Sequence, residues 1–246
     1  MKPKPLLLNL ASLLASAVLM LCAWAPTSAQ AQANAEENPC GPIANHYGPF
    51  DYRTQHEPLK IVEKHHFTPQ VEGLIRGQET YIGGDLNYTL HTSPNHHRAL
   101  VAMMRLFEKT KGKQPEGVEL PLECYLERAI RFAPDDTVVR VLYVLFLSAH
   151  DRAPEALLQL NAADFYAKDN GFSHYNIGMA YAELRDYENA LIQAHKAMSL
   201  GFDRQGLADL LKSVGKWQDP PLEPGTPPAA AASAPEVEAG SEIRHP

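Results

Sequence analysis

Residues 171–202 carry the pattern that most constrains the fold of this chain. The stretch reads GFSHYNIGMAYAELRDYENALIQAHKAMSLGF, and a short break at 184–186 divides it into two segments. In both segments the apolar and small residues recur at helical spacing. They are Tyr175, Ile177, Gly178, Tyr181 and Leu184 in the first segment, and Tyr187, Ala190, Leu191, Ala194, Ala197 and Met198 in the second. Two amphipathic helices joined by so short a break are expected to pack on each other.

The ends of these segments carry the signals of helix termini. Asp186 stands where the second helix begins, a position that favours a short acidic side chain, and Gly201 stands just past its end. Gly178 and Ala190 are the small residues that allow the two backbones to approach closely. These residue types serve packing, so the stretch predicts a structural unit rather than a catalytic one.

The same pattern recurs upstream at an interval of 34 residues. The shift superimposes Ile177 on Tyr143, Tyr181 on Leu147, Ala190 on Ala156 and Ala197 on Ala163, and a second shift places Ala163 on Ala129. An internal period of this length indicates stacked supersecondary units, each of which buries its apolar face against its neighbours.

The segment HYNIGMAY at 174–181, followed by DYENAL at 186–191 and Ala197, resembles the tetratricopeptide repeat (TPR). This resemblance implies an all-α, right-handed helix-turn-helix solenoid of about four repeats. The motifs GPFDYR, HFTP, GGDLNYTL and SPNHHRAL also resemble a group of secreted proteobacterial repeat proteins, which implies export but assigns no activity.

The repeat pattern extends over residues 67–218, the expected TPR domain. Its expected units are 67–96 (helices near 69–77 and 84–93), 97–136, 137–170 and 171–204, followed by a capping helix at 204–217 that covers the last apolar face. The unit at 97–136 is six residues longer than the period, and we place the extra residues in its interhelical loop, KTKGKQPEG. Pro154 is expected in the first turn of its helix.

Both ends of the chain differ from the repeats. Residues 1–33 combine Lys2 and Lys4, an apolar run and Ala-Gln repeats, which predicts a signal peptide; an uncleaved inner-membrane anchor is the alternative. Residues 34–66 are rich in Gly, Pro and aromatic residues and are expected to form an irregular arm. Residues 219–246 are rich in Pro and Ala without apolar periodicity, which predicts a disordered tail. The expected location is therefore periplasmic or secreted, with no membrane span after cleavage.

Cleavage would leave 20 basic and 29 acidic residues, a net charge of −9 that argues against nucleic-acid binding. It would also leave two cysteines, Cys40 and Cys124. In an oxidising compartment an even number favours a disulfide, although two unconnected buried thiols stay open as an alternative. A disulfide closing a loop of roughly 80 residues would stabilise the fold by about 4 kcal/mol in the chain-entropy estimate.

Histidine is the residue type that most suggests a ligand site. Seven of the eleven histidines lie between His46 and His97, including the pairs His65-His66 and His96-His97. Clustered imidazoles bind zinc or copper, but adjacent residues on a helix point about 100° apart and no His-x3-His or Cys-x2-Cys spacing occurs. We therefore predict no metal or other cofactor, and keep a metal or small-molecule carrier as the alternative function.

The sequence lacks the motifs of the common enzyme classes. It has no Gly-x-Ser-x-Gly elbow, phosphate loop or nucleotide fingerprint, and Gly83-Gly84 precedes a helix without the rest of such a motif. An exported cysteine on a packed helix, as expected for Cys124, is more often bridged or buried than nucleophilic. We therefore expect a non-enzymatic protein.

The resemblance to TPR proteins implies that an extended peptide binds along the concave face, which the first helix of each repeat lines. Carried over position by position, this face comprises Arg98, Val101, Arg105, Val138, Val141, Leu145, Phe172, Tyr175 and Met179. The carboxylate clamp of chaperone-binding TPR proteins is not expected, because only Asn176 matches it while Ala102 and Leu142 occupy the equivalent places. The expected function is a protein- or peptide-binding scaffold of the bacterial cell envelope. The alternative for the apolar strip is ordinary core, or a surface covered by the N-terminal arm.

Overall fold

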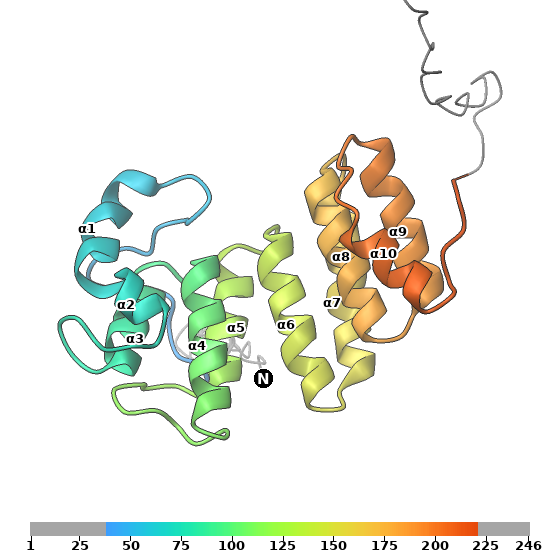
Figure 1. The fold of residues 1–246 in the computed structure, drawn as a ribbon. Coiled ribbons are helices and arrows are strands. Elements are labelled where there is room, and N and C mark those ends of the chain that lie inside the picture. Colours follow the sequence, from blue (N-terminus) through green and yellow to red (C-terminus); the bar gives the residue numbers. More distant parts are fainter. Residues whose placement is uncertain (1–37, 221–246) are drawn as a thin grey trace, which may run out of the picture. The chain divides into compact units, whose positions relative to one another are not determined.

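The computed structural model describes residues 38–220, and all regular secondary structure in that range is helical. This confirms the all-α prediction. The expected signal peptide and nearly all of the Pro/Ala-rich tail lie outside the described residues. The helices form two compact units that divide after Pro134 (Figure 1).

Unit 1, which ends at Pro134, is built around the helix α3. Its helices are α1 (His56–His66), α2 (Pro69–Glu72), α3 (Ile82–Thr92), α4 (His97–Lys109) and α5 (Leu122–Phe132). Helix α3 packs against α1, α2 and α4, and α4 packs against α5. Leu86, Leu90, Leu100, Met103 and Leu126 are fully buried in its core. Between α4 and α5 lies the long loop in which we placed the six extra residues.

The arm at 34–66 is less irregular than expected, because its last eleven residues form α1. Only Leu59 and Val62 are buried on this helix, and this narrow apolar face explains why the sequence pattern was weak. Conversely, the helix expected near 69–77 ends at Glu72. Gly73 follows it and Leu74 adopts a φ of 56°, so the backbone leaves the helical path there.

The remainder of the arm is attached to unit 1 at two places. Cys40 and Cys124 are joined by a disulfide with an Sγ–Sγ distance of 2.06 Å, the pairing that an exported location favours. Beside it, the Arg128 guanidinium donates to the backbone oxygens of Cys40 and Pro42. Further along, the N–H of Phe50 donates to the carbonyl oxygen of Thr92 at the end of α3 (2.9 Å). The arm is thus held both to α5 and to the α3–α4 connection.

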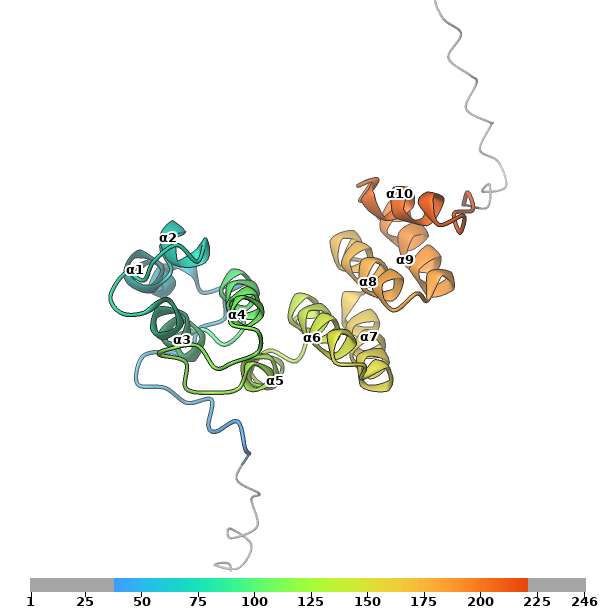
Figure 2. The ribbon, with the colours of Figure 1, turned by 60° about the horizontal axis from the view of Figure 1, so that its bottom comes forward.

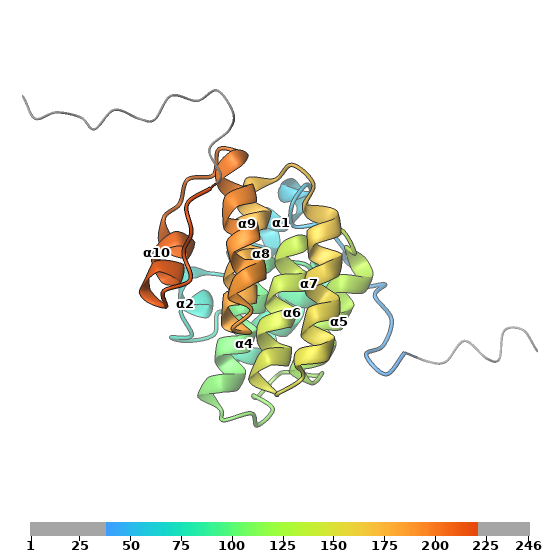
Figure 3. The same ribbon diagram turned by 90° about the vertical axis from the view of Figure 1, so that its right-hand side faces the viewer.

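Unit 2, which begins at Asp135, contains two helical hairpins and a further helix. Its helices are α6 (Thr137–Ala149), α7 (Ala153–Ala167), α8 (Gly171–Glu183), α9 (Tyr187–Ser199) and α10 (Gly206–Ser213). Figure 2 shows the α6–α7 pair next to the α8–α9 pair, with α10 beyond them, and Figure 3 shows α6 to α9 side by side. Helix α10 contacts both α8 and α9.

Short polar side chains cap three helices of unit 2, namely α6, α8 and α9. The carboxylate of Asp136 accepts from the N–H groups of Val138 and Val139 at the start of α6, and the Asn170 side chain accepts from Ser173 N–H at the start of α8. Asp186 caps α9 in the same way, accepting from Asn189 N–H (3.2 Å), as its position in the sequence predicts. Pro154 lies in the first turn of α7, which is also the expected place.

Close packing between α8, α9 and α10 depends on Gly178. A Cβ atom placed there would lie 2.4 Å from Cδ2 of Leu207, 3.1 Å from Cβ of Gln193 and 3.3 Å from the carbonyl oxygen of Ala190. The sequence indicated the approach to Ala190, but the contact with Leu207 brings in α10 as well. Leu207 and Leu211 are buried, so α10 covers apolar surface of the preceding pair.

Replacing Gly178 with Val is expected to destabilise unit 2 by about 1–3 kcal/mol, because the added atoms overlap a packed interface. Urea denaturation followed by circular dichroism measures this change. The control is Ala149→Val, which introduces the same side chain at the exposed end of α6. Helix propensity favours Val over Gly but not over Ala, so steric overlap is needed to make Gly178→Val the less stable variant. Equal stability of the two variants would contradict close packing at Gly178.

Replacing both Cys40 and Cys124 with Ala removes a cross-link between residues separated by 84 positions. The free energy of unfolding is expected to fall by up to about 4 kcal/mol, because the unfolded chain has more conformational entropy without the cross-link. The measurement is the urea midpoint of the variant, compared with wild type before and after treatment with dithiothreitol. If the reductant lowers the midpoint of the double variant as much as that of wild type, the disulfide is not its target.

Candidate functional site

The nine residues of the expected binding face fall into two groups, three in unit 1 and six in unit 2. Arg98, Val101 and Arg105 follow one another along one side of α4. All three line a single pocket of about 180 Å³, together with Glu72, His97 and Ala102. The structure therefore brings together the three residues that were expected on α4.

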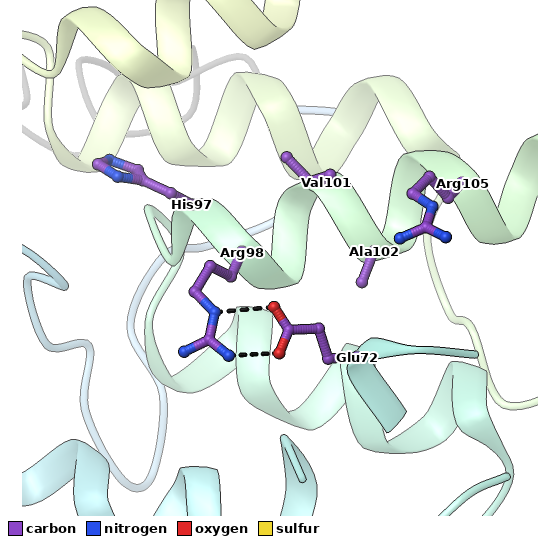
Figure 4. A pocket seen from close by; sticks show the side chains of 6 residues that line it. All are labelled: Glu72, His97, Arg98, Val101, Ala102 and Arg105. Carbon is purple, nitrogen blue, oxygen red and sulfur yellow. Dashed lines mark hydrogen bonds and ion pairs between the residues drawn. The ribbon is translucent and has the colours of Figure 1, made fainter. Parts of the chain in front are cut away.

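Figure 4 shows how this pocket, which we call the α4 pocket, is built. Arg98 and Arg105 lie at opposite ends of a row on α4 with Val101 and Ala102 between them, while Glu72 reaches toward Arg98 from α2. Val101 is 40% exposed and lines the pocket between the two guanidinium groups. The pocket thus has an apolar centre with a guanidinium group at each end, and the one at Arg98 is paired with Glu72.

Arg98 and Glu72 form a two-pronged ion pair in the α4 pocket. The Arg98 Nε donates to Glu72 Oε1 over 2.8 Å, and Arg98 Nη2 donates to Glu72 Oε2. These hydrogen bonds lower the pKa of Glu72 and raise that of Arg98, and the charge of Arg105 lowers the pKa of Glu72 further. Because both partners are partly exposed, the pair adds little to stability and mainly fixes the guanidinium plane.

The six expected residues of unit 2 lie on α6 and α8, which contact each other. Leu145 and Phe172 are 37% and 45% exposed, whereas Val138, Val141, Tyr175 and Met179 are partly buried. Phe172 and Tyr175 both pack against Phe202, with ring centroids 5.7 Å and 5.3 Å away. Part of this face is therefore occupied by the chain itself, and Leu145 and Phe172 remain the most accessible of the six.

The three residues at the positions of the carboxylate clamp are buried or partly buried in the helix packing. Ala102 is buried on α4 and Leu142 is buried on α6. Asn176 is partly buried on α8. No donor from α4 or α6 at these positions is available to hold a carboxylate.

The histidines of unit 1 are distributed among separate contacts. His65 faces Glu79, His66 faces Asp85, and His96 faces Glu63, at distances of 2.9, 3.0 and 3.2 Å. Within residues 38–220, no three His, Cys, Asp or Glu side chains are arranged so that they could hold a metal ion.

His96 is a fully buried imidazole at the start of α4. Its Nδ1 accepts from the N–H of Ala99 (3.2 Å), so the remaining ring nitrogen carries the proton and donates to Glu63. Tyr52 stacks on the ring with centroids 4.2 Å apart, which joins the arm to this junction. Burial lowers the pKa of His96 to about 3, so the ring is neutral at physiological pH.

A second buried polar group, His174, connects the helices of unit 2. Its Nδ1 lies 2.7 Å from Gln193 Oε1 and its Nε2 lies 2.7 Å from the carbonyl oxygen of Lys168. Gln193 in turn donates to Asp164 Oδ1 (2.8 Å). Burial opposes ionisation of Asp164, but hydrogen bonds from Gln193 and Lys196 and nearby positive charges give a net lowering of its pKa. This network links α7, α8 and α9 and has a structural role.

Sequence reasoning missed Glu72 and His97 as lining residues of the α4 pocket. Glu72 reaches the pocket from α2, and helical spacing reports only which residues share a face of one helix. His97 is the first residue of α4 and directly precedes Arg98. The sequence alone could therefore have predicted that it lies at the Arg98 end of the pocket. The buried roles of His96 and His174 carried no sequence signal beyond a polar residue next to apolar ones.

Comparisons of this chain with protein-family models, with curated proteins and with solved structures found no match. Between residues 38 and 220, no helix is both long and apolar enough to cross a bilayer; the longest, α7, has 15 residues.

Acid is expected to destabilise unit 1 through His96. Because the pKa of His96 is about 3 in the folded protein and ordinarily 6.5, the unfolded chain binds the proton more readily. Neutral His96 therefore contributes its full stabilisation to the folded state above pH 6.5. The free energy of unfolding falls by up to about 1.4 kcal/mol per pH unit as the pH drops from there toward 3.

The test of this expectation compares wild type with His96→Asn, which retains a capping side chain but does not titrate. Free energies of unfolding are measured in urea between pH 7 and pH 4.5, with His46→Asn in the exposed part of the arm as the control. His96→Asn is expected to have a smaller pH slope than the other two proteins. Identical slopes would show that His96 is not the titrating group.

Proposed function

We propose that this protein is a TPR-like helical repeat protein that binds another protein or an extended peptide in the bacterial cell envelope. In this proposal the helical hairpins form a right-handed solenoid of about four repeats. The protein acts as a non-enzymatic scaffold or adaptor.

The spacing of the helices in unit 2 supports the repeat assignment. Helices α6 and α8 begin at Thr137 and Gly171, and α7 and α9 begin at Ala153 and Tyr187, so both pairs are offset by 34 residues. This offset matches the period of the sequence and the length of a TPR unit. Helix α10 then occupies the place of the terminal cap that a solenoid requires.

The α4 pocket is the single observation that carries the binding proposal. It places Val101 in an accessible position between Arg98 and Arg105, although a solvated helix face has no need of an apolar residue there. An apolar side chain of a peptide fits the centre of the pocket, and an acidic group of the same peptide fits the Arg105 end. The Arg98 guanidinium is already paired with Glu72 and serves to orient the rim.

Export is the other part of the proposal, and it depends on the signal-peptide pattern and the disulfide. A Cys40–Cys124 bond is stable in an oxidising compartment such as the periplasm. The acidic net charge makes nucleic acid an unsuitable partner. The alternative of a small-molecule carrier is favoured by a different pocket of unit 1, whose lining includes His66, Tyr88 and His91.

Selection of peptides from a random library on the full-length protein, followed by fluorescence anisotropy with the selected peptides, tests the proposal. Val101→Glu is expected to weaken binding at least tenfold, because a carboxylate replaces the apolar centre. Leu145→Glu tests whether the face on α6 contributes to the same peptide.

The control variant is Leu158→Glu, which changes a 66% exposed residue on α7 in the same way and lies outside the expected face. It should bind the selected peptides as tightly as wild type. Melting temperatures within a few degrees of wild type would show that all three variants are folded. If Val101→Glu binds like the control, the α4 pocket is not the peptide site.

A further inference from the structure

A second pocket of unit 1, with a volume of about 440 Å³, has a different character. It is bordered by the end of α1, by α3 and by residues 117–119 of the loop between α4 and α5. We call it the α3 pocket. Glu119 is the one acidic side chain that lines it, and no lysine or arginine is among its lining residues. Its volume is in the range of sites for small organic molecules.

The first binding group in the α3 pocket is His66. Its Nδ1 lies 3.0 Å from Oδ1 of Asp85, whose side chain is fully buried. The other oxygen of Asp85 accepts from the N–H groups of Gln78 (2.6 Å) and Glu79 (3.3 Å), so the carboxylate is an acceptor on both sides. The ring of His66 must therefore donate through Nδ1, which leaves Nε2 as an acceptor in the neutral imidazole.

His91 has the same arrangement on α3. Its Nδ1 donates to the backbone oxygen of Asn87 over 2.9 Å, so its Nε2 is also left as an acceptor. A carboxylate oxygen of Glu119 lies 3.8 Å from that nitrogen. His91 and Glu119 together form one position suited to a positively charged group with several N–H donors.

A second such position lies where His66 meets Tyr88. The two rings are stacked with their centroids 4.0 Å apart, and Tyr88 is 41% exposed. An ammonium group near this pair donates to His66 Nε2 and is attracted by the electron-rich face of the Tyr88 ring. The α3 pocket thus contains two acceptor positions, one with a full negative charge and one with an aromatic ring.

Two features decide the kind of ligand. No three His, Cys, Asp or Glu side chains among residues 38–220 converge as a metal ion would require. His66 and His91 line the pocket from different helices, α1 and α3, so it has an acceptor on each of two sides. Separated acceptor positions in one pocket suit a ligand of several atoms with a donor at each end. From this geometry we propose that the α3 pocket binds a small organic diamine, with one ammonium group at His91 and Glu119 and the other at His66 and Tyr88.

Isothermal titration calorimetry with the full-length protein tests this proposal. The probes are 1,4-diaminobutane and 1-aminobutane, which have the same chain length but differ in the number of ammonium groups. The diamine is expected to bind at least tenfold more tightly than the monoamine, because it alone occupies both positions. Glu119→Gln is expected to weaken diamine binding at least tenfold.

The matched control is Glu116→Gln, which removes the same charge from the same loop outside the pocket and should leave the affinity unchanged. Tyr88→Leu should weaken the diamine more than the monoamine. Equal affinities for the two amines would overturn the proposal. So would tighter binding of butanedioate, which would mean that the imidazoles act as donors, or a Glu119-dependent rise in melting temperature with zinc chloride alone.

This test is independent of the peptide experiment, because its variants do not touch the α4 pocket. If the protein binds peptides but no amine, the proposed peptide-binding function stands and the diamine proposal fails. The reverse result would identify the chain as a small-molecule carrier.

Discussion

The imidazole of His96 is fully buried, accepts from the first turn of α4 and donates to Glu63 of α1. Tyr52 of the arm and Phe67, which follows α1, pack against the same ring. One neutral side chain therefore joins α1, α4 and the arm, because its two hydrogen bonds connect α4 to α1 and its ring packs against Tyr52.

Unit 2 is organised differently, because its helices repeat at a fixed offset and pack through small residues. Gly178 lets α8 approach α9 and α10, while the hydrogen bonds of His174, Gln193 and Asp164 connect α7 to the same pair. The apolar contacts provide most of the driving force, and the polar network fixes one arrangement of the helices. Most of the expected binding residues in this unit are partly buried by the same packing.

The two proposed sites of unit 1 differ in charge and in kind. The α4 pocket carries two guanidinium groups and an exposed valine, which suits a peptide with an apolar and an acidic group. The α3 pocket carries imidazole acceptors and a carboxylate, which suits an amine.

The sequence by itself determined the all-helical class, the helix starts at Asp186 and Pro154, and the row Arg98, Val101 and Arg105. These features depend on residues close together in the chain, where helical spacing and capping act. Only the tertiary structure decided that α1 forms within the arm, that Glu72 pairs with Arg98, and that Phe202 covers part of Phe172 and Tyr175. Those contacts join residues from separate segments, and a periodic pattern reports which face of a helix is apolar but not which segment covers it.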